Sequence, residues 1–331
     1  MILIDIYFEP SYGKLYEEIE SGEAVFFHHK STLGEIYHSF IKRAVTEKVN
    51  GIQYYDIITP YGYGGPVIKE VSNGSRSELV EEFYKEFSLY CEQNNIISEF
   101  VRFHPLFENQ RDFNSLYDVH FMRKTVGTNL KDYEEPFQEE FSKSCRKEVR
   151  RALKKGVSYN ITEKPNDVKR FLDIYFSTMN RNQASDYYYF NEKYFNDALK
   201  YFKENIVVIE ATYDNNTIAM GFYFVYGDYI HIHLSGTLTE YLNLSPAYIL
   251  KYGIVQWGKR NSYKTIHHGG GKSNDDDDTL YKFKRKFGKN TEFDFYIGKK
   301  IWNNDIYKRL CDKLNVKSDI DFFPAYRSVK V

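Results

Sequence analysis

Three apolar segments joined by two tight turns constrain the fold of this 331-residue chain most strongly. They cover 206–213, 218–226 and 229–235, and they are rich in Val, Ile, Phe and Tyr. The turns carry Asp214-Asn215-Asn216 and Gly227-Asp228, which are residue types that favour β-hairpins. Each short turn reverses the chain, so consecutive hairpins give an antiparallel meander. The second half of the chain is therefore expected to contain an antiparallel sheet.

Helices and further strands are expected around this meander. Apolar periodicity predicts helices at 33–45, 77–93, 137–155, 168–179, 246–259 and 280–287, and strands at 2–8, 265–268 and 293–297. This alternation indicates an α/β chain of the α+β kind, with mixed, largely antiparallel sheets. At roughly 150 residues per domain the length indicates two domains. We place the first at 1–132, with 315–331 as a segment that can complete it, and the second at 133–314.

Charge and cysteine content narrow the class of protein. The 45 Lys and Arg residues balance 46 Asp and Glu residues, so no overall field attracts DNA, RNA or an acidic membrane. Cys91, Cys145 and Cys311 show no C-x-x-C spacing, which argues against a disulfide framework and favours a reducing compartment. No apolar stretch approaches the roughly 18 residues of a membrane span. We therefore expect a cytoplasmic protein without a membrane span, and peripheral contact with a membrane stays open.

The predicted helix 137–155 carries its positive charge on one side. At about 100° per residue, Lys143, Lys147, Arg150 and Lys154 form one stripe, and apolar residues occupy the opposite face. Such a stripe suits phosphate contacts with RNA or with a nucleotide-linked substrate. The alternative is an ordinary solvated helix face, although such faces usually mix both signs of charge. Lys147, Arg150 and Lys154 are our candidate ligands for donor phosphate.

A second basic cluster lies in the predicted helix 280–287. Phe283 and Phe287 are four residues apart and are expected to anchor the helix, so that Lys284 projects from a fixed base. Lys282 and Arg285 join the candidate phosphate ligands. In the alternative interpretation, this helix only neutralises the acidic residues 275–278 that precede it, and these residues form a solvated loop and cap.

The segment Gly269-Gly270-Gly271-Lys272-Ser273 resembles half of a phosphate-binding P-loop. The first glycine of that motif would fall at Ile266, and four aspartates follow where an apolar helix should begin, so we reject nucleotide hydrolysis. Three glycines after a buried strand still indicate that backbone or ligand approaches closely there.

Histidines form the last candidate group. His231 and His233 share one face of a strand, and His267-His268 are expected nearby. No carboxylate or thiol with metal-ligand spacing accompanies them, so we expect no metal and interpret them as hydrogen-bonded histidines of the core or of a cleft.

Taken in order, these motifs resemble the FemABX-like branch of the GNAT acyltransferase superfamily. The resemblance rests on the basic segment 142–157, the strand end 231–237, the segment 267–271 and the Phe-Lys-Arg-Lys-Phe-Gly run 283–288, with further similarity at 61–66, 103–105 and 322–327. It implies two GNAT-like domains in tandem. It also implies transfer of an amino acid from aminoacyl-tRNA to an amine of a peptidoglycan precursor, without a metal or a redox cofactor.

The resemblance implies roles for several residues. Lys284 matches a lysine near the reacting carbonyl, and Arg181 matches an arginine that holds substrate phosphate. Tyr61 and Tyr63 would line the acceptor groove, with simple loop aromatics as the alternative. The remaining candidate substrate contacts are Tyr187, Gly269, Gly270 and Gly271.

The chemistry of amide formation gives these assignments a physical basis. An amine that attacks an ester or thioester builds negative charge on the carbonyl oxygen, which a fixed ammonium such as Lys284 stabilises. The attacking amine must also lose a proton, for which His231 or His233 is the candidate base.

Two departures from the family keep alternatives open. The coiled-coil arm of several peptidoglycan-branching members is absent, and no Trp-containing match to their N-terminal phosphate-binding lysine is found. The segment 238–246 has no glycine, which disfavours the pyrophosphate loop of acyl-CoA enzymes. The leading hypothesis is an acyltransferase or aminoacyltransferase that forms an amide bond on an amine of a cell-envelope precursor, either a peptidoglycan peptide or a surface-glycan amino sugar. By the FemABX-like resemblance, its donor is aminoacyl-tRNA. An N-acyltransferase using acyl-CoA and a non-enzymatic RNA-binding protein are the alternatives.

Overall fold

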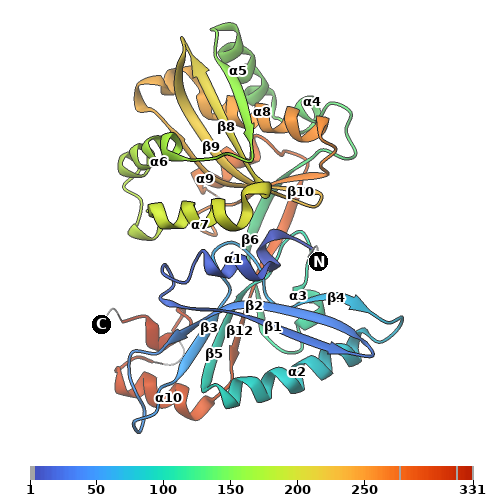
Figure 1. The fold of residues 1–331 in the computed structure, drawn as a ribbon, viewed down its shortest axis with the longest axis vertical. Coiled ribbons are helices and arrows are strands. Elements are labelled where there is room, and N and C mark those ends of the chain that lie inside the picture. Colours follow the sequence, from blue (N-terminus) through green and yellow to red (C-terminus); the bar gives the residue numbers. More distant parts are fainter. Residues whose placement is uncertain (1–3, 276, 318–319, 330–331) are drawn as a thin grey trace. The chain divides into compact units, whose positions relative to one another are not determined.

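The chain folds into two compact units (Figure 1). The computed structural model describes residues 4–275, 277–317 and 320–329. Unit 1 comprises Met1–Met122 together with Asp294–Val331, and unit 2 comprises Arg123–Phe293. The chain leaves unit 1 within β6 (Asp118–Asn129) and returns within β12 (Glu292–Ile301). These divisions differ from the sequence-based boundaries at 132/133 and 314/315, because both crossings occur inside strands rather than in loops.

Unit 1 contains a mixed sheet in the order β1-β2-β3-β5-β12, and β4 pairs with β2. β3 and β5 are parallel, whereas β1 with β2, β2 with β3 and β5 with β12 are antiparallel. Helix α2 (Arg76–Gln93) lies along this sheet (Figure 1). Its buried Phe83 and Phe87 share one core cluster with Ile36, Phe40 and Val101 of the strands. The strands are β1 (Gly22–Ser31), β2 (Gly34–Ala44), β3 (Tyr55–Ile58), β4 (Val67–Val71) and β5 (Ile96–Arg102), and the C-terminal helix is α10 (Asn304–Lys313).

Two sequence-based expectations in unit 1 are wrong. The segment 33–45, expected as a helix, is β2. Ile36 and Phe40 pack toward α2 while Tyr37 packs with Phe8 in another cluster, so both faces of the strand are buried and no polar alternation marks it. In the segment 2–8, expected as a strand, the first residues lie outside the described part, and Ile6–Phe8 form a 3₁₀ turn capped by Asp5.

Unit 2 contains the sheet β6-β11-β10-β9-β8-β7. The expected meander is present, because β8, β9 and β10 pair antiparallel through two hairpin turns in which Asp214, Asn215 and Gly227 adopt positive φ. β10 and β11 pair in parallel. The strands are β7 (Ser158–Glu163), β8 (Ile206–Tyr213), β9 (Asn216–Tyr226), β10 (Tyr229–Thr237) and β11 (Thr265–Gly270).

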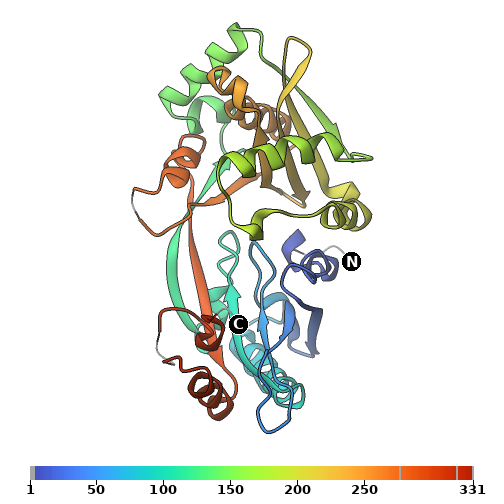
Figure 2. The ribbon, with the colours of Figure 1, turned by 90° about the vertical axis from the view of Figure 1, so that its left-hand side faces the viewer.

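Helices cover both faces of the unit 2 sheet. Alternate residues of β9 show this, because Phe222 packs against α6 and α7 while Tyr223 packs in the core beneath α5 and α8. Helices α6 and α7 lie beside each other in both views (yellow-green in Figure 2). We call these two sides the α6 face and the α8 face. The helices are α5 (Lys143–Lys154), α6 (Lys169–Arg181), α7 (Glu192–Phe202), α8 (Pro246–Arg260) and α9 (Thr279–Arg285).

The single helix expected at 137–155 is interrupted. It consists of α4 (Pro136–Glu140) and α5, separated by Phe141 in an extended conformation. Ser142 caps α5 by accepting a hydrogen bond from the Cys145 N–H. Glu140 is fully buried and accepts hydrogen bonds from the N–H groups of Asn129 and Asn290, which fixes the end of α4 on β6 and on the turn before β12. Among the described residues, no helix is both long enough and apolar enough to cross a membrane.

Candidate functional site

β10 and β11 separate part of the way along unit 2. Their parallel pairing covers three residue pairs and ends at His231 and His267, although both strands continue for several residues. Each strand is also irregular beyond this point, with a register shift in β10 around His233 and one in β11 around His268. The sheet therefore opens at His268, where side chains from the helices can approach the strand ends.

Lys284 on α9 lies at the end of β11. Its Nζ donates a hydrogen bond of 2.7 Å to the carbonyl oxygen of Gly270. Burial lowers the pKa of Lys284 to about 8, an effect that Asp278 opposes and Arg123 reinforces. The group is therefore mainly an ammonium at pH 7, and it loses its charge close above that pH.

Packing holds Lys284 in place as the sequence predicts. The rings of Phe283 and Phe287 meet edge to face at 5.0 Å, and Tyr248 of α8 contacts both. Phe287 is fully buried. α9 is thus anchored on α8 by one aromatic cluster, which leaves little freedom to the lysine between the two phenylalanines.

Asp278 connects α9 to the glycine segment. Its Oδ1 accepts from the Tyr281 N–H at 2.8 Å, and its Oδ2 accepts from the N–H groups of Lys272 and Ser273 at 2.6 and 2.7 Å. The sequence predicts a cap in a solvated acidic loop. Asp278 does cap the helix, but it is buried. The carboxylate therefore fixes both the start of the helix and the turn that follows β11.

The glycines of this turn make room for the protein's own side chains. A Cβ on Gly271 would lie 2.6 Å from Asp278, and a Cβ on Gly270 would lie 3.0 Å from the Cδ of Arg123. Gly269 has a φ of +74°, which favours glycine. The sequence predicts that backbone or ligand comes close to these glycines, and a close approach is confirmed. Arg123 lies against Gly270, and Asp278 lies against Gly271.

Three polar residues that sequence reasoning missed, Thr128, Lys251 and Arg123, lie around His268 and the end of β11. Thr128 of β6 contacts His268 with 2.8 Å between Oγ1 and Nε2, and the Nδ1 of His268 lies 3.5 Å from the Nζ of Lys251 on α8. Arg123 donates to the carbonyl oxygen of Gly271 at 2.8 Å. Lys251 is 6% exposed. The sequence could have indicated that Lys251 is buried, because it is a lone lysine on the apolar face formed by Ile249, Leu250 and Ile254.

The two histidines proposed as bases lie on the other side of the sheet. His233 packs against α7, where its Nε2 is 2.6 Å from the hydroxyl of Tyr194. Burial, reinforced by His231, lowers the pKa of His233 to about 3. His231 is buried with its ring 6.0 Å from that of His267. His233 therefore lies on the α6 face, and Lys284 packs with α8, so the structure does not bring these two candidates together.

Arg181 and Tyr187 lie near the end of β10 and after α6. The guanidinium of Arg181 donates to the carbonyl and hydroxyl oxygens of Thr237 and to the hydroxyl of Thr239, at 2.7 to 3.0 Å. Tyr187 is half-buried and its ring contacts Tyr188. Arg181 thus holds the end of α6 to the end of β10, which places its charge at the open end of the strand.

Tyr61 and Tyr63 belong to a loop of unit 1. The carbonyl oxygen of Tyr61 accepts from the hydroxyl of Tyr12 at 2.8 Å, and the ring of Tyr63 packs edge to face on those of Tyr7 and Phe295. Both side chains are half-buried, so their structural role in this loop is clear from the contacts.

The candidate phosphate ligands divide into two groups. Lys147, Arg150 and Lys154 are exposed along α5, and Arg150 also donates to Gln138 at 3.2 Å. On α9, Lys282 pairs with Asp277 at 2.5 Å and Arg285 pairs with Glu292 at 2.9 Å. Acidic neighbours therefore balance part of the positive charge of α9, as expected if this helix neutralises the acidic residues before it. The basic stripe on α5, by contrast, faces solvent.

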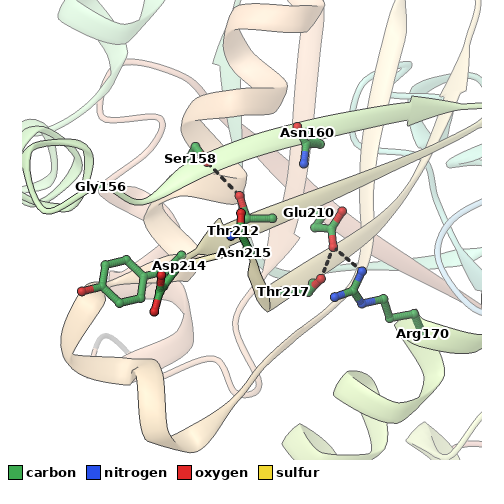
Figure 3. A pocket seen from close by; sticks show the side chains of 10 residues that line it. Gly156, Ser158, Asn160, Arg170, Glu210, Thr212, Asp214, Asn215 and Thr217 are labelled. Atoms are coloured by element: carbon green, nitrogen blue, oxygen red, sulfur yellow. Dashed lines mark hydrogen bonds and ion pairs between the residues drawn. The ribbon is translucent and has the colours of Figure 1, made fainter.

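A cavity of about 400 Å³ lies elsewhere in unit 2, at the open ends of β7, β8 and β9 (Figure 3). In it Glu210 pairs with Arg170 at 3.1 Å and accepts a hydrogen bond from Thr217, and the hydroxyls of Ser158 and Thr212 are 2.8 Å apart (Figure 3). None of the candidate site residues lines this cavity.

Comparison with known proteins gives one family match and several similar structures. Residues 139–285 match the family model described as "Acetyltransferase (GNAT) domain". The crystal structure of FemX is similar with a TM-score of 0.70 and 12% identity, covering 93% of this chain and 94% of that chain. No curated protein sequence matches the chain significantly.

Two further structures are similar: one is named as a putative lysylphosphatidylglycerol synthetase, and the other is named L-PGS. One is the C-terminal domain of a putative enzyme from Agrobacterium fabrum, with a TM-score of 0.57, 13% identity and coverage of 92% and 91% of the two chains. The other is from Bacillus licheniformis, with a TM-score of 0.54, 14% identity and coverage of 88% and 91%.

These findings confirm the expected fold class of two tandem GNAT-like domains with mixed, largely antiparallel sheets. The chain is thus an acyltransferase whose second unit holds a GNAT domain, and it shares its fold with FemX.

Proposed function

We propose that the chain forms an amide bond by transferring an aminoacyl group from aminoacyl-tRNA to an amine of a cell-envelope precursor. The acceptor is a peptidoglycan peptide or an amino sugar of a surface glycan, and the reaction takes place in the cytoplasm without a metal or a redox cofactor. The FemABX-like motifs and the FemX-like fold support this proposal. The similar structure named as a putative lysylphosphatidylglycerol synthetase supports an aminoacyl group as the cargo.

Lys284 is the single observation that carries the proposal. Its ammonium is held on the Gly270 carbonyl by an aromatic anchor, at the point where β10 and β11 have separated. As nitrogen attacks the donor carbonyl, charge develops on the carbonyl oxygen, and a fixed cation in a partly buried site stabilises that charge. The exposed basic stripe on α5 supplies candidate contacts for the phosphates of the donor.

Parallel assays with two labelled donors test this proposal. tRNA charged with radiolabelled amino acids and radiolabelled acetyl-CoA are each offered to nucleotide-linked peptidoglycan peptides, to amino-sugar glycans and to phosphatidylglycerol vesicles. We expect label to move from tRNA to an amine acceptor. Label from acetyl-CoA alone would replace the proposal by the acyl-CoA alternative, and label on phosphatidylglycerol would replace the amine acceptor by a hydroxyl.

The non-enzymatic alternative makes a separate set of predictions. An RNA-binding protein would bind RNA with a steep dependence on salt, would label no acceptor, and would lose only affinity in Lys284→Ala. Loss of turnover in Lys284→Ala at unchanged tRNA affinity would exclude it.

A further inference from the structure

Thr128 determines which nitrogen of His268 carries the proton. The Thr128 hydroxyl lies 2.8 Å from the carbonyl oxygen of Phe287, which can only accept, so the single hydroxyl proton is donated there. The contact of 2.8 Å between Thr128 Oγ1 and His268 Nε2 must then be donated by the histidine. His268 is therefore protonated on Nε2, and the Nδ1 of the neutral ring is an acceptor.

That acceptor faces Lys251. The Nζ of Lys251 lies 3.5 Å from Nδ1, so one N–H of the lysine points at the ring. The other hydrogen-bonding positions of Nζ are directed away from His268. Both side chains are almost completely buried, at 6% exposed for Lys251 and 1% for His268. The titratable groups that face Lys251 are His268 of β11, Lys284 of α9 and the ring of Tyr223 of β9.

The described groups that face Lys251 include no carboxylate to balance a positive charge on it. Among the described residues it forms no ion pair, and burial, reinforced by the charge of Lys284, lowers the pKa of Lys251 well below its usual value. Burial likewise lowers the pKa of His268, with Lys251 and Lys284 adding to the effect. The arrangement thus disfavours a positive charge on both the imidazole of His268 and the amine of Lys251, next to the charged Lys284.

Tyr223 provides a second, independent sign of an unfilled polar position on the α8 face. Its hydroxyl is buried and has no hydrogen-bond partner among the described residues. It lies on the α8 face, with its ring 5.9 Å from the Nζ of Lys251. An unpaired buried hydroxyl costs free energy, so a polar group of a substrate or water is expected beside it.

We propose that Lys251 is the base that accepts the proton lost by the attacking amine, and that His268 and Thr128 are positioning residues that hold it. This inference rests on the proposed function and deepens it, because it assigns the proton acceptor of that reaction. Lys251 suits this step better than His233, whose pKa of about 3 makes it a weak base and which lies on the α6 face.

The proposed step balances without another reactant. The amine nitrogen bonds to the donor carbonyl carbon, and the carbonyl π electrons move to oxygen beside the Lys284 ammonium. Lys251 takes the proton from the nitrogen and becomes an ammonium. When the intermediate collapses, the C–O bond of the donor ester breaks and its oxygen takes this proton, so the products are an amide and an alcohol and Lys251 is neutral again.

The charge of Lys251 can be measured without any substrate. The protein is labelled with ¹³C at the lysine Cε, and the Lys251 signal is assigned with Lys251→Met and followed from pH 5 to 10. We expect it in the amine form at pH 7. Thr128→Val lets His268 move its proton to Nδ1, so we expect the Lys251 signal to shift, whereas Thr128→Ser should restore the wild-type position.

Thr125→Val is the matched control. Thr125 also lies on β6, and its hydroxyl is 2.9 Å from the Nε2 of another buried histidine, His267. The same chemical change is therefore made next to the wrong histidine, and we expect the Lys251 signal to stay where it is. An ammonium signal for Lys251 at pH 7, or equal shifts in the two valine variants, would overturn the proposal.

Kinetics complete the test once a donor and an acceptor are in hand. Lys251→Met should lower kcat by about 10² to 10⁴ with KM within about twofold, because only proton transfer is lost. It should also remove the acidic limb of the pH profile. A kcat within about threefold of the wild-type value would overturn the assignment. If the wild type turns over none of the donors, the proposed function fails, and the charge measurement still decides whether Lys251 is the neutral amine.

Discussion

Lys284 links function and stability at the scale of one residue. A lysine that is buried as a cation costs folding free energy, since the unfolded chain holds its proton more tightly than the folded chain does. The pKa of Lys284 is lowered to about 8 from its usual value of 10.5, so the unfolded state binds more protons between these two values. The stability of the protein should therefore rise with pH over this range.

Lys284→Met tests both aspects. We expect the free energy of unfolding at pH 7 to increase by about 1 to 3 kcal/mol, because the buried charge is removed. We expect kcat to fall by about 10² to 10³ for loss of the oxyanion contact. Urea unfolding and steady-state kinetics measure the two effects. The exposed Lys308→Met on α10 is the control and should change neither.

The wild-type rate should also depend on pH in one direction. If the ammonium form of Lys284 is required, kcat declines as pH rises through about 8. A rate that keeps rising to pH 10 would contradict this role for Lys284.

At the scale of elements, α9 and the turn before it depend on Asp278. Burial opposes its ionisation, yet the hydrogen bonds from the backbone N–H groups of Tyr281, Ser273 and Lys272 hold the pKa of Asp278 well below its usual range. Its contribution to stability is therefore present above the ordinary aspartate pKa and is lost in strong acid.

Asp278→Ala removes the cap of α9 and the acceptor for the turn together. We expect it to lower the free energy of unfolding by about 1 to 2 kcal/mol. It should also increase hydrogen exchange at the N–H groups of Lys272, Ser273 and Tyr281. Asp277→Ala, at an exposed neighbour, should have little effect, and equal losses in both variants would show that the cap is not the cause.

The basic stripe on α5 is a second element-scale test. Reversal of two exposed charges in Lys147→Glu/Arg150→Glu should weaken donor binding by about tenfold or more and make the dependence of binding on salt less steep. The melting temperature should stay the same, since neither side chain is in the core. Lys308→Glu/Arg309→Glu on α10 makes the same change at two exposed positions and is the control. Unchanged affinity would show that the stripe is only solvated.

Elements with a clear local signal could be predicted from the sequence, and the others could not. The meander β8–β9–β10 was predictable because turn residues mark both hairpins, and the anchor of α9 because Phe283 and Phe287 are four residues apart. β2 was misassigned because burial on both faces removes the alternation of polar and apolar residues. The break at Phe141 was missed because the apolar periodicity continues across it.

The same limit applies to the candidate site. The fixed position of Lys284 was predictable, because Phe283 and Phe287 lie close to it in the sequence. Thr128, His268 and Lys251 come from three separate elements, so only the tertiary fold brings them together. His233 looked like a base in the sequence, and only its packing against α7 reveals how strongly burial disfavours its charge.

At the scale of the whole molecule, the C-terminal segment stabilises unit 1. The hydroxyl of Tyr326 lies 2.7 Å from the Oγ of Ser98 and donates to Asp56 at 3.2 Å, and Arg327 pairs with the same aspartate. Tyr326 is 3% exposed and packs on Tyr307 of α10. These contacts join the end of the chain to strands formed much earlier in the sequence.

Tyr326→Ala should therefore lower the free energy of unfolding by about 3 to 5 kcal/mol, which is the usual cost of emptying a large aromatic site. Tyr326→Phe should lose only the hydrogen bonds, at about 1 to 3 kcal/mol. Denaturant unfolding of both variants measures these losses. Equal stability of Tyr326→Ala and the wild type would show that the segment contributes nothing to unit 1.

The two crossings within β6 and β12 set an order for folding during synthesis. Every residue of unit 2 has been synthesised once residue 293 is made, whereas unit 1 still lacks most of β12, which pairs with β5. On the ribosome, the half that starts second is therefore the first to have its whole sequence, and the half that starts first must wait with an unpaired strand edge. A nascent chain released before β12 is complete would expose that edge, so the completion of β12 protects the chain against aggregation.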